Sequence, residues 1–382
     1  MDFSWTADQV AFKKRVIEFA RNKLGANLVE RDRKSEFARE DWQRCADFGI
    51  QSYPVPAEFS GRDPIDFMTA MLAMEAIGYG CKDNGLTFAL NAQMWTVQLP
   101  IVQFGTEAQK RKYLPGLSSG DLIGAHAITE PDTGSDVFNM KMTATKQNGG
   151  YVLNGKKKFI SLGPIADVAL VFATVDPDQG RWGVTAFLVD SDTEGFEASP
   201  VREKMGLRSV PIGELEFMDC FVPDDQRVGP EGTGVSLSTH SLEWERCCIL
   251  ASQLGAMDRQ LEEAIRYARN RKQFGQPIGK FQSVANRLVE MKLRLETSRL
   301  LLYKVAWLKQ AGKSAMMEAA LLKLHLGESF VESSLDAIRI HGGTGYMTET
   351  GVERDLRDAI GSVIYAGTSD IQRNIVAGLL GL

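Results

Sequence analysis

The sequence contains little cysteine and little histidine, with five cysteines and four histidines among 382 residues. Structural metal sites and disulfide scaffolds need characteristic spacings of these residue types. The cysteines show no C-x-x-C spacing and no pairing with histidine at the intervals of metal ligands; they are Cys45, Cys81, Cys220, Cys247 and Cys248. We therefore expect reduced cysteines that serve in packing, and no metal centre.

An excess of basic charge is also missing. Asp and Glu outnumber Lys and Arg by 49 to 44, a net charge of −5, and no stripe of cations mixed with aromatic residues marks a nucleic-acid surface. No apolar run approaches the roughly 18 residues of a membrane span, and the first residues lack a cationic region followed by an apolar one. We expect a cytoplasmic protein that binds neither nucleic acid nor membrane.

What the sequence does contain is the composition of a globular protein. Hydrophobic residues make up 44% of the chain and charged residues 24%, and the length suffices for two or three packed units. The sequence texture predicts an α+β protein with a helical domain at 1–120, a β domain at 121–234 and a second helical domain at 235–382. No repeat or Pro/Ser-rich linker separates them, so we expect them to pack as one subunit.

Local patterns support this order. Thr6 with Gln9, and Thr106 with Gln109, have the capping-box spacing that begins a helix. Residues 168–175 and 184–189 are β-branched and aromatic runs, the best strand candidates. Between 281 and 305 apolar residues recur every three or four positions, which predicts one long amphipathic helix.

Three glycine-containing segments present groups suited to a cofactor. The turn at 127–136 directs hydroxyls and N–H groups to one concave spot, although a well-capped turn needs no ligand. In 268–275, Arg271 beside Gln273 can clamp a diphosphate, although cations at a helix C-terminus are favourable by themselves. The glycine pair in 339–346 permits close backbone approach, but its spacing is not that of a Rossmann fingerprint.

Taken in order, these segments resemble the acyl-CoA dehydrogenase family of flavoproteins over essentially the whole chain. The family's T-E-P-x-x-G-S-D stands at 129–136, its R-x-x-F-G at 271–275, its I-H-G-G-x-G-Y at 340–346, and its G-T-x-x-x-Q/R begins at Gly367. The resemblance implies a helical N-terminal domain, a middle β domain and a C-terminal four-helix bundle, with FAD held without covalent attachment.

The resemblance also implies which residues bind FAD. Those around the isoalloxazine ring would be His126, Ile128, Thr129, Gly134, Ser135, Phe159 and Ser161. Those that reach the adenine and pyrophosphate half of FAD in a neighbouring subunit would be Arg271, Gln273, Phe274 and Gln282, and the site would be completed by Arg339, Gly342, Gly343, Thr368 and Asp370. The subunits must then associate, in the family as a homotetramer. Phe159 replaces a common Trp, and Arg339 replaces a common Gln, which either strengthens a phosphate contact or breaks the usual geometry.

The reaction implied by the resemblance needs a carboxylate base. It takes the α-proton of an acyl thioester while hydride leaves the β carbon for flavin N5. Many members place this Glu where the present chain has Ala366. Isovaleryl-type members take it from an E-R dipeptide, which matches Glu245 and Arg246. Glu243 would lie about 200° away around the helix, and the plain alternative is that both carboxylates are solvated.

Three residues are expected at the substrate: Ser135, Arg246 and Ala366. The resemblance places Arg246 beside the thioester carbonyl or the phosphopantetheine arm, unless it forms a structural ion pair. The backbone N–H of Ala366 remains able to donate to the thioester oxygen despite the missing carboxylate.

We therefore predict FAD-dependent α,β-dehydrogenation of an acyl thioester carried by CoA or a carrier protein, with an electron-transferring flavoprotein or oxygen as acceptor. An alternative is oxidation of a prolyl or aminoacyl group tethered to a carrier protein in natural-product biosynthesis, because the E-W-E-R setting resembles biosynthetic members. A second alternative, motivated by Ala366, is an inactive flavin-binding assembly subunit. The presence of Glu245 argues against it.

Overall fold

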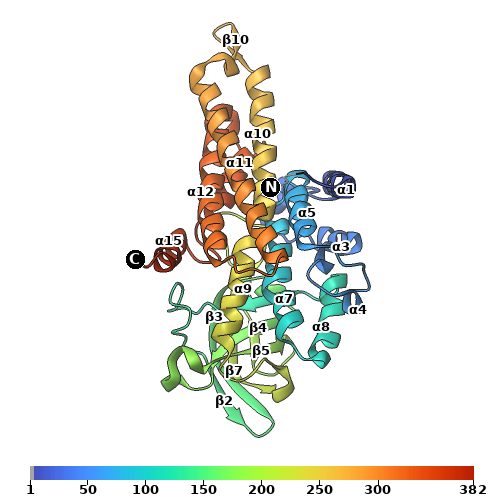
Figure 1. The fold of residues 1–382 in the computed structure, drawn as a ribbon, viewed down its shortest axis with the longest axis vertical. Coiled ribbons are helices and arrows are strands. Elements are labelled where there is room, and N and C mark those ends of the chain that lie inside the picture. Colours follow the sequence, from blue (N-terminus) through green and yellow to red (C-terminus); the bar gives the residue numbers. More distant parts are fainter. Residues whose placement is uncertain (1–3) are drawn as a thin grey trace.

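The structure is a computed structural model that describes residues 4–382. A bundle of long helices stands on a β domain, and the N-terminal helices lie along the side of both (Figure 1). The predicted order of helical, β and helical segments is the order found. The domain limits at 120 and 234 stay predictions. No helix among residues 4–382 is long and apolar enough to cross a membrane.

The N-terminal helices begin where the sequence provides side-chain caps. The hydroxyls of Thr6 and Thr106 accept hydrogen bonds from the backbone N–H groups of Gln9 and Gln109, and both predicted capping boxes are formed. A π-helical turn, Met94–Gln98, joins α6 to α7. The helices are α1 (Ala7–Lys23), α2 (Leu28–Lys34), α3 (Arg39–Phe48), α4 (Ala57–Ser60), α5 (Phe67–Gly80), α6 (Asn84–Gln93), α7 (Leu99–Phe104) and α8 (Glu107–Ser119).

The β domain contains an eight-stranded sheet in the order β6-β7-β3-β2-β4-β5-β8, with β1 paired in parallel to β4. Both strongest strand candidates are strands, and β4 is buried along its whole length because both faces of the sheet are covered there. The strands are β1 (Gly124–Ala127), β2 (Thr143–Gln147), β3 (Gly150–Ser161), β4 (Val168–Thr174), β5 (Val184–Asp190), β6 (Phe196–Ala198), β7 (Ile212–Pro223) and β8 (Arg227–Val228).

The C-terminal part contains the predicted long helix, α11, which packs with α10 and α12. A small hairpin of β9 (Lys272–Gln273) and β10 (Gln276–Pro277) closes the far end of the bundle (Figure 1). The helices are α9 (Gly234–Cys248), α10 (Ala251–Asn270), α11 (Gln282–Gln310), α12 (Met316–His341), α13 (Gly343–Tyr346), α14 (Val352–Gly361) and α15 (Ser369–Leu379).

Two glycines lock the N-terminal helices to the bundle where α5 crosses α10. A Cβ atom on Gly78 would lie 1.7 Å from the carbonyl oxygen of Ser252, and one on Gly255 would lie 1.9 Å from that of Glu75. Helix α9 contacts α12, the π turn and β5. The helix therefore joins the three parts of the subunit: Gly234 at its start lies against Val184 of β5, and its last turn, which carries Glu245, contributes Cys247 and Cys248 to the core shared by the N-terminal helices and the bundle.

Candidate active site

A buried ion pair fixes the loop between β1 and β2. The Nζ atom of Lys157 lies 2.8 Å from Oε1 of Glu130 and 3.1 Å from the carbonyl oxygen of Ile128, and Lys157 is fully buried. The Glu130 carboxylate also accepts hydrogen bonds from the N–H groups of Lys141 and Met142. Burial lowers the pKa of Lys157 to about 8 and Glu130 opposes the shift. The pair thus ties both ends of the predicted cofactor loop to β3.

This loop leaves polar groups that await a partner. Nε2 of His126 and Oγ1 of Thr133 are buried and have no hydrogen-bond partner within the described part of the chain. Burial, assisted by Lys157, lowers the pKa of His126 to about 4, so its ring is neutral. Phe159 holds a φ of 59° and exposes 64% of its surface beside the loop. Orphaned polar groups next to an exposed aromatic face fit the flavin that the resemblance implies.

The other predicted ring-lining residues belong to this loop or to the end of β3. The carbonyl oxygen of Thr129 accepts a hydrogen bond of 2.8 Å from the N–H of Lys158, directly before Phe159. Gly134 and Ser135 are exposed at the outer end of the loop, and Ser161 ends β3. The structure therefore brings Ile128 and Thr129 beside the β3 residues that precede Phe159, and the place of the other predicted residues at the ring stays a prediction.

The predicted adenine and pyrophosphate contacts lie elsewhere. Arg271, Gln273, Phe274 and Gln282 are exposed around the β9–β10 hairpin, and Phe274 exposes 92% of its surface. This hairpin lies at the opposite end of the subunit from the β domain (Figure 1). Within one chain they cannot meet the ring-lining residues, as expected if they serve a neighbouring subunit.

Part of the third glycine-containing segment lies at the same end of the bundle. The hydroxyl of Tyr267, near the end of α10, donates to the carbonyl oxygen of His341. Gly342 has a φ of 60°, which favours glycine, and Gly343 follows it. Arg339 lies 3.3 Å from Asp336, which also pairs with other arginines on α11. The Arg that replaces the family's Gln is thus anchored to a carboxylate.

Thr368 and Asp370 begin α15. The Thr368 hydroxyl accepts a hydrogen bond of 3.2 Å from the N–H of Ile371, so it caps the helix. Asp370 is exposed and pairs with Arg373 at 3.0 Å. Both residues thus have structural roles beside any contact to a cofactor.

Glu245 has the environment of a general base. Its carboxylate forms no hydrogen bond or ion pair with any of residues 4–382. Protein atoms surround it densely although part of the side chain stays accessible. Burial raises its pKa to about 7, against the opposing charges of Arg246 and Lys323. A carboxylate with a pKa near neutrality is suited to accept and release a proton.

Glu243 has a different environment. Its carboxylate contacts the Nζ atom of Lys309 at 2.5 Å and accepts a hydrogen bond of 3.1 Å from the N–H of Ala315. Both charged side chains are largely buried. The alternative that the two glutamates are solvated surface residues is therefore wrong for Glu243. This residue forms a buried ion pair between α9 and α11.

Arg246 and Ala366 present unused hydrogen-bond donors. Arg246 is buried, its Nε has no partner, and it forms no ion pair within the described residues. The N–H of Ala366 likewise has no partner there. Ala366 and Gly367 have φ values of 55° and 82°, and the side chain of Gln372 donates to both carbonyl oxygens. The turn therefore keeps its shape without the carboxylate found in other members.

Sequence reasoning missed three residues near this centre: Lys323, Tyr365 and Gln253. Lys323 on α12 is fully buried and its Nζ has no partner in residues 4–382. Tyr365 hydrogen bonds to Gln253. Lys323 lies on the same face of α12 as the core residues Ala319 and Leu326. A lysine at a position where the helical period expects an apolar residue could have indicated it.

Fold and geometry together define a class: a dehydrogenase with a candidate base, Glu245, on the helix that joins the β domain to the helical bundle. Models of the acyl-CoA dehydrogenase N-terminal, middle and C-terminal domains match residues 6–121, 125–220 and 232–380. The chain belongs to the acyl-CoA dehydrogenase family. The family, fold and enzyme class predicted from the sequence are confirmed.

Similar proteins cover the whole chain. The L-prolyl-[peptidyl-carrier protein] dehydrogenase of Pseudomonas fluorescens is 42% identical over 383 residues, covering 100% of both chains. The solved structure of the prolyl acyl carrier protein oxidase AnaB is 49% identical with a TM-score of 0.98, covering 99% of this chain and 100% of AnaB. The structure of PigA with FAD and proline is 41% identical with a TM-score of 0.97, covering 100% of both.

Proposed function

We propose that this enzyme oxidises a prolyl group held as a thioester on a carrier protein. The reaction class, dehydrogenation of an acyl thioester, is that of the family. The prolyl substrate is supported by the relatives, since the P. fluorescens enzyme and AnaB carry both the prolyl group and a carrier protein in their names. The structural observation that supports this chemistry is Glu245, whose carboxylate has no partner in residues 4–382, in a chain with Ala366 where other members carry the glutamate.

FAD is the cofactor. When bound, it accepts the hydride that leaves the substrate's β carbon. His126, Thr133 and Phe159 would hold the flavin ring, and Arg271 and Gln273 of a neighbouring subunit would reach its diphosphate and adenine. Lys157 and Glu130, paired at 2.8 Å, hold the ring-binding loop against β3.

The chain's own residues then divide the remaining work. Glu245 removes the proton on the carbon next to the thioester carbonyl, so that its carboxylate becomes a carboxylic acid. The free N–H of Ala366 donates to the thioester oxygen as negative charge develops there. Arg246, buried and free of ion pairs, binds the thioester or the phosphopantetheine arm. The charge of Arg246 also limits how far burial raises the pKa of Glu245.

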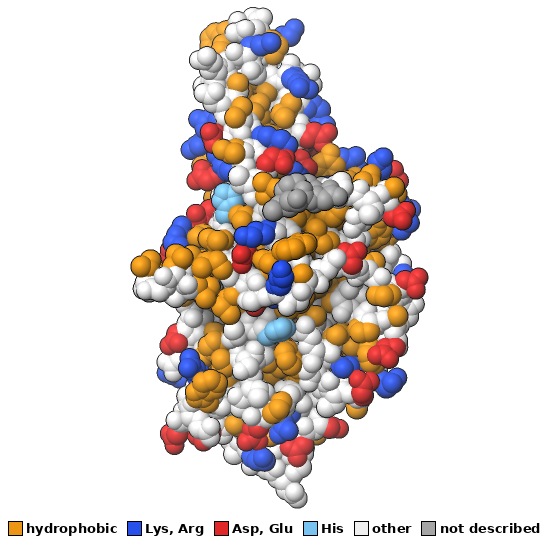
Figure 2. Space-filling view, viewed as in Figure 1, with side chains coloured by type: hydrophobic (Ala, Val, Ile, Leu, Met, Phe, Trp, Pro, Cys, Tyr) orange, Lys and Arg blue, Asp and Glu red, His pale blue; other side chains and the backbone are white. Residues whose placement is uncertain are grey.

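The partners follow from the same reading. The thioester arrives on the carrier protein, and the electrons pass to an electron-transferring flavoprotein or to oxygen. A homotetramer would supply Arg271 from a second chain. Exposed apolar side chains gather over α15 (Figure 2), and others lie on α11; they include Val289, Leu293, Leu300, Leu379, Leu380 and Leu382. Such exposed apolar side chains are suited to subunit contacts.

The test is anaerobic bleaching of the flavin by a panel of thioesters. We expect prolyl-loaded carrier protein to reduce the flavin faster than prolyl-CoA, isovaleryl-CoA or butyryl-CoA. Equal reduction by the CoA esters would remove the carrier protein from the proposal. Fast reduction by an acyl thioester without a ring would remove the prolyl group.

A further inference from the structure

Lys323 is a buried cation without a counter-ion in contact. It lies in the middle of α12 on the face that carries Ala319, Leu326 and Phe330, all of them core residues. None of its surface is exposed, and its Nζ hydrogen bonds to none of residues 4–382. Burying a charge without a partner is costly. A lysine at such a position therefore calls for a functional account.

The charge nearest in effect is that of Glu245. Helix α12 packs against α9, and among the charges acting on Lys323 the carboxylate of Glu245 is the leading one, ahead of Arg246 and Glu328. Burial lowers the pKa of Lys323 to about 8, while Glu245 opposes the shift. The ammonium therefore remains largely charged at neutral pH. It lies on α12, a helix other than the base's own.

We propose that Lys323 is a positioning residue for the base, whose buried ammonium favours the ionised form of the Glu245 carboxylate. This inference rests on the proposed role of Glu245. The two side chains form no direct ion pair, so Lys323 acts on Glu245 through its electrostatic field. A carboxylate held in a salt bridge would be a poorer base. Lys323 thus tunes Glu245 without occupying its oxygens.

The other charged groups around Glu245 are already accounted for. On α9, Glu243 is neutralised by Lys309 of α11. On α12, Glu328 is paired with Arg373 of α15. Burial raises the pKa values of Tyr365 and Cys248, which keeps both neutral. Arg246 and Lys323 are then the two cations that act on the base. Arg246 also has substrate groups to bind, which leaves Lys323 as the cation dedicated to Glu245.

The experiment measures the rate of flavin reduction in single turnover against pH, with competent thioester. The parent rate should reach half its plateau near pH 7, the pKa of Glu245. Lys323→Met removes the cation and should move this midpoint upward by roughly one pH unit, whereas Lys323→Arg should keep it. The double variant Lys309→Met with Glu243→Gln is the matched control: it removes a nearby buried lysine together with its paired carboxylate, so the local net charge is unchanged and the midpoint should stay.

A Lys323→Met midpoint equal to that of the parent would overturn the inference. Because the substitution removes a buried unpaired charge, we expect the variant to fold, which flavin absorbance and thermal unfolding check. If it does not fold, Lys323→Gln is subject to the same criterion. Failure of the proposed function is distinguishable: it would appear as parent-like flavin reduction in Glu245→Gln, whatever Lys323 does.

Discussion

Glu243 and Glu245 lie two residues apart on α9, yet one carboxylate is bound to Lys309 and the other has no partner in the described chain. The helical period places them on different faces. Glu243 thereby joins α9 to α11 and to the start of α12. Glu245 faces the centre where Arg246 and Lys323 act on it. Position around one helix turn separates a structural carboxylate from a candidate base.

The first prediction uses this contrast. Glu245→Gln keeps the shape of the side chain but removes its proton affinity, so flavin reduction should fall by roughly 10² to 10⁴ while FAD stays bound. Glu243→Gln should bleach nearly as fast as the parent, with lower thermal stability because Lys309 loses its counter-ion. Rapid-mixing absorbance measures both rates. Slow bleaching in Glu243→Gln with a parent-like Glu245→Gln would transfer the base to Glu243.

The second prediction moves the base. In Glu245→Gly combined with Ala366→Glu, the carboxylate stands at the position used by other family members. Ala366 already holds a φ of 55°, so the longer side chain adds little backbone strain beyond what alanine bears. Part of the lost activity should return, although a misplacement of about 1 Å can cost roughly a hundredfold. A double variant no faster than Glu245→Gly alone would show that position 366 does not face the substrate.

The fold was predictable because its signals are local. The Thr6 and Thr106 caps, the strand runs and the apolar period of α11 each depend on residues close in sequence, and each was found. The family motifs then fixed how these elements assemble. The loop after β1 contacts β3 through Ile128 and Thr129, but the assembly of the predicted residues around FAD stays a prediction.

Other parts of the site were invisible to sequence reasoning for a physical reason. Lys157 stands in a run of three lysines that resembles a solvated strand edge, and only the alternation of β3 buries the middle one against Glu130. Lys323 depends on how α12 faces α9, a packing relation between residues almost eighty positions apart. Neither relation is written in a local pattern.

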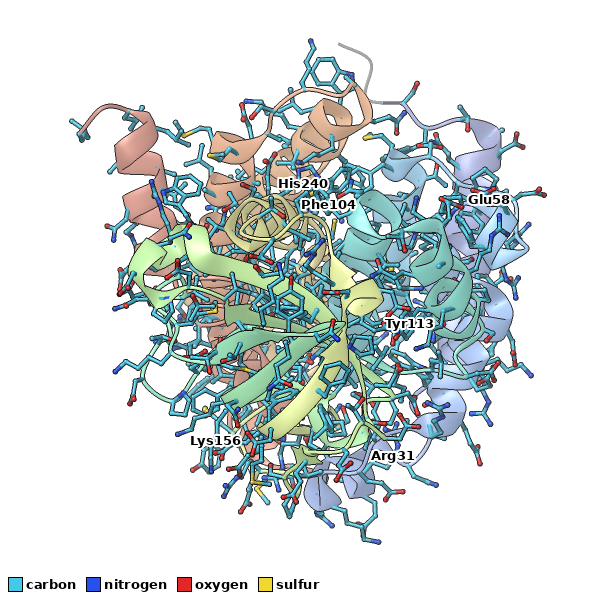
Figure 3. The ribbon with its side chains drawn as sticks, turned by 90° about the horizontal axis from the view of Figure 1, so that it is seen from below. Arg31, Glu58, Phe104, Tyr113, Lys156 and His240 are labelled. Carbon is cyan, nitrogen blue, oxygen red and sulfur yellow. The ribbon has the colours of Figure 1, made fainter. Side chains whose placement is uncertain are left out.

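The third prediction concerns the ion pair under the cofactor loop. Lys157→Met would leave the Glu130 carboxylate buried without its cation, which should cost about 3 to 5 kcal/mol of stability and weaken FAD retention. Lys156→Met is the control, since Lys156 lies on the exposed side of β3 (Figure 3), where its ammonium forms a solvent-exposed ion pair of 2.8 Å with Glu216. It should change little. Thermal unfolding and flavin release report both effects; parent-like behaviour of Lys157→Met would show that the loop does not need the pair.

The fourth prediction concerns the contact between subunits. Arg271→Ala should weaken FAD binding and loosen the oligomer together, since charge-assisted contacts are worth roughly 1.5 to 3 kcal/mol each. Arg269→Ala, two residues earlier and also exposed, should do neither. Flavin titration and light scattering measure the two properties. If Arg271→Ala retains both FAD and assembly, the cross-subunit contact is wrong.

The fifth prediction follows from the raised pKa of Glu245. Burial lifts it from 4.5 to about 7, so the folded protein binds this proton more tightly than the unfolded chain. The group's contribution to stability is therefore complete at low pH and is lost as the pH rises through about 7. Glu245→Gln mimics the protonated form, so it should match the parent near pH ~4.5 and exceed it by up to about 3 kcal/mol near pH ~8. Thermal unfolding at the two pH values measures the difference. Glu243→Gln should instead be less stable than the parent at both, because it loses its ion pair, and a Glu245→Gln difference that does not grow with pH would show that Glu245 ionises normally in the folded protein.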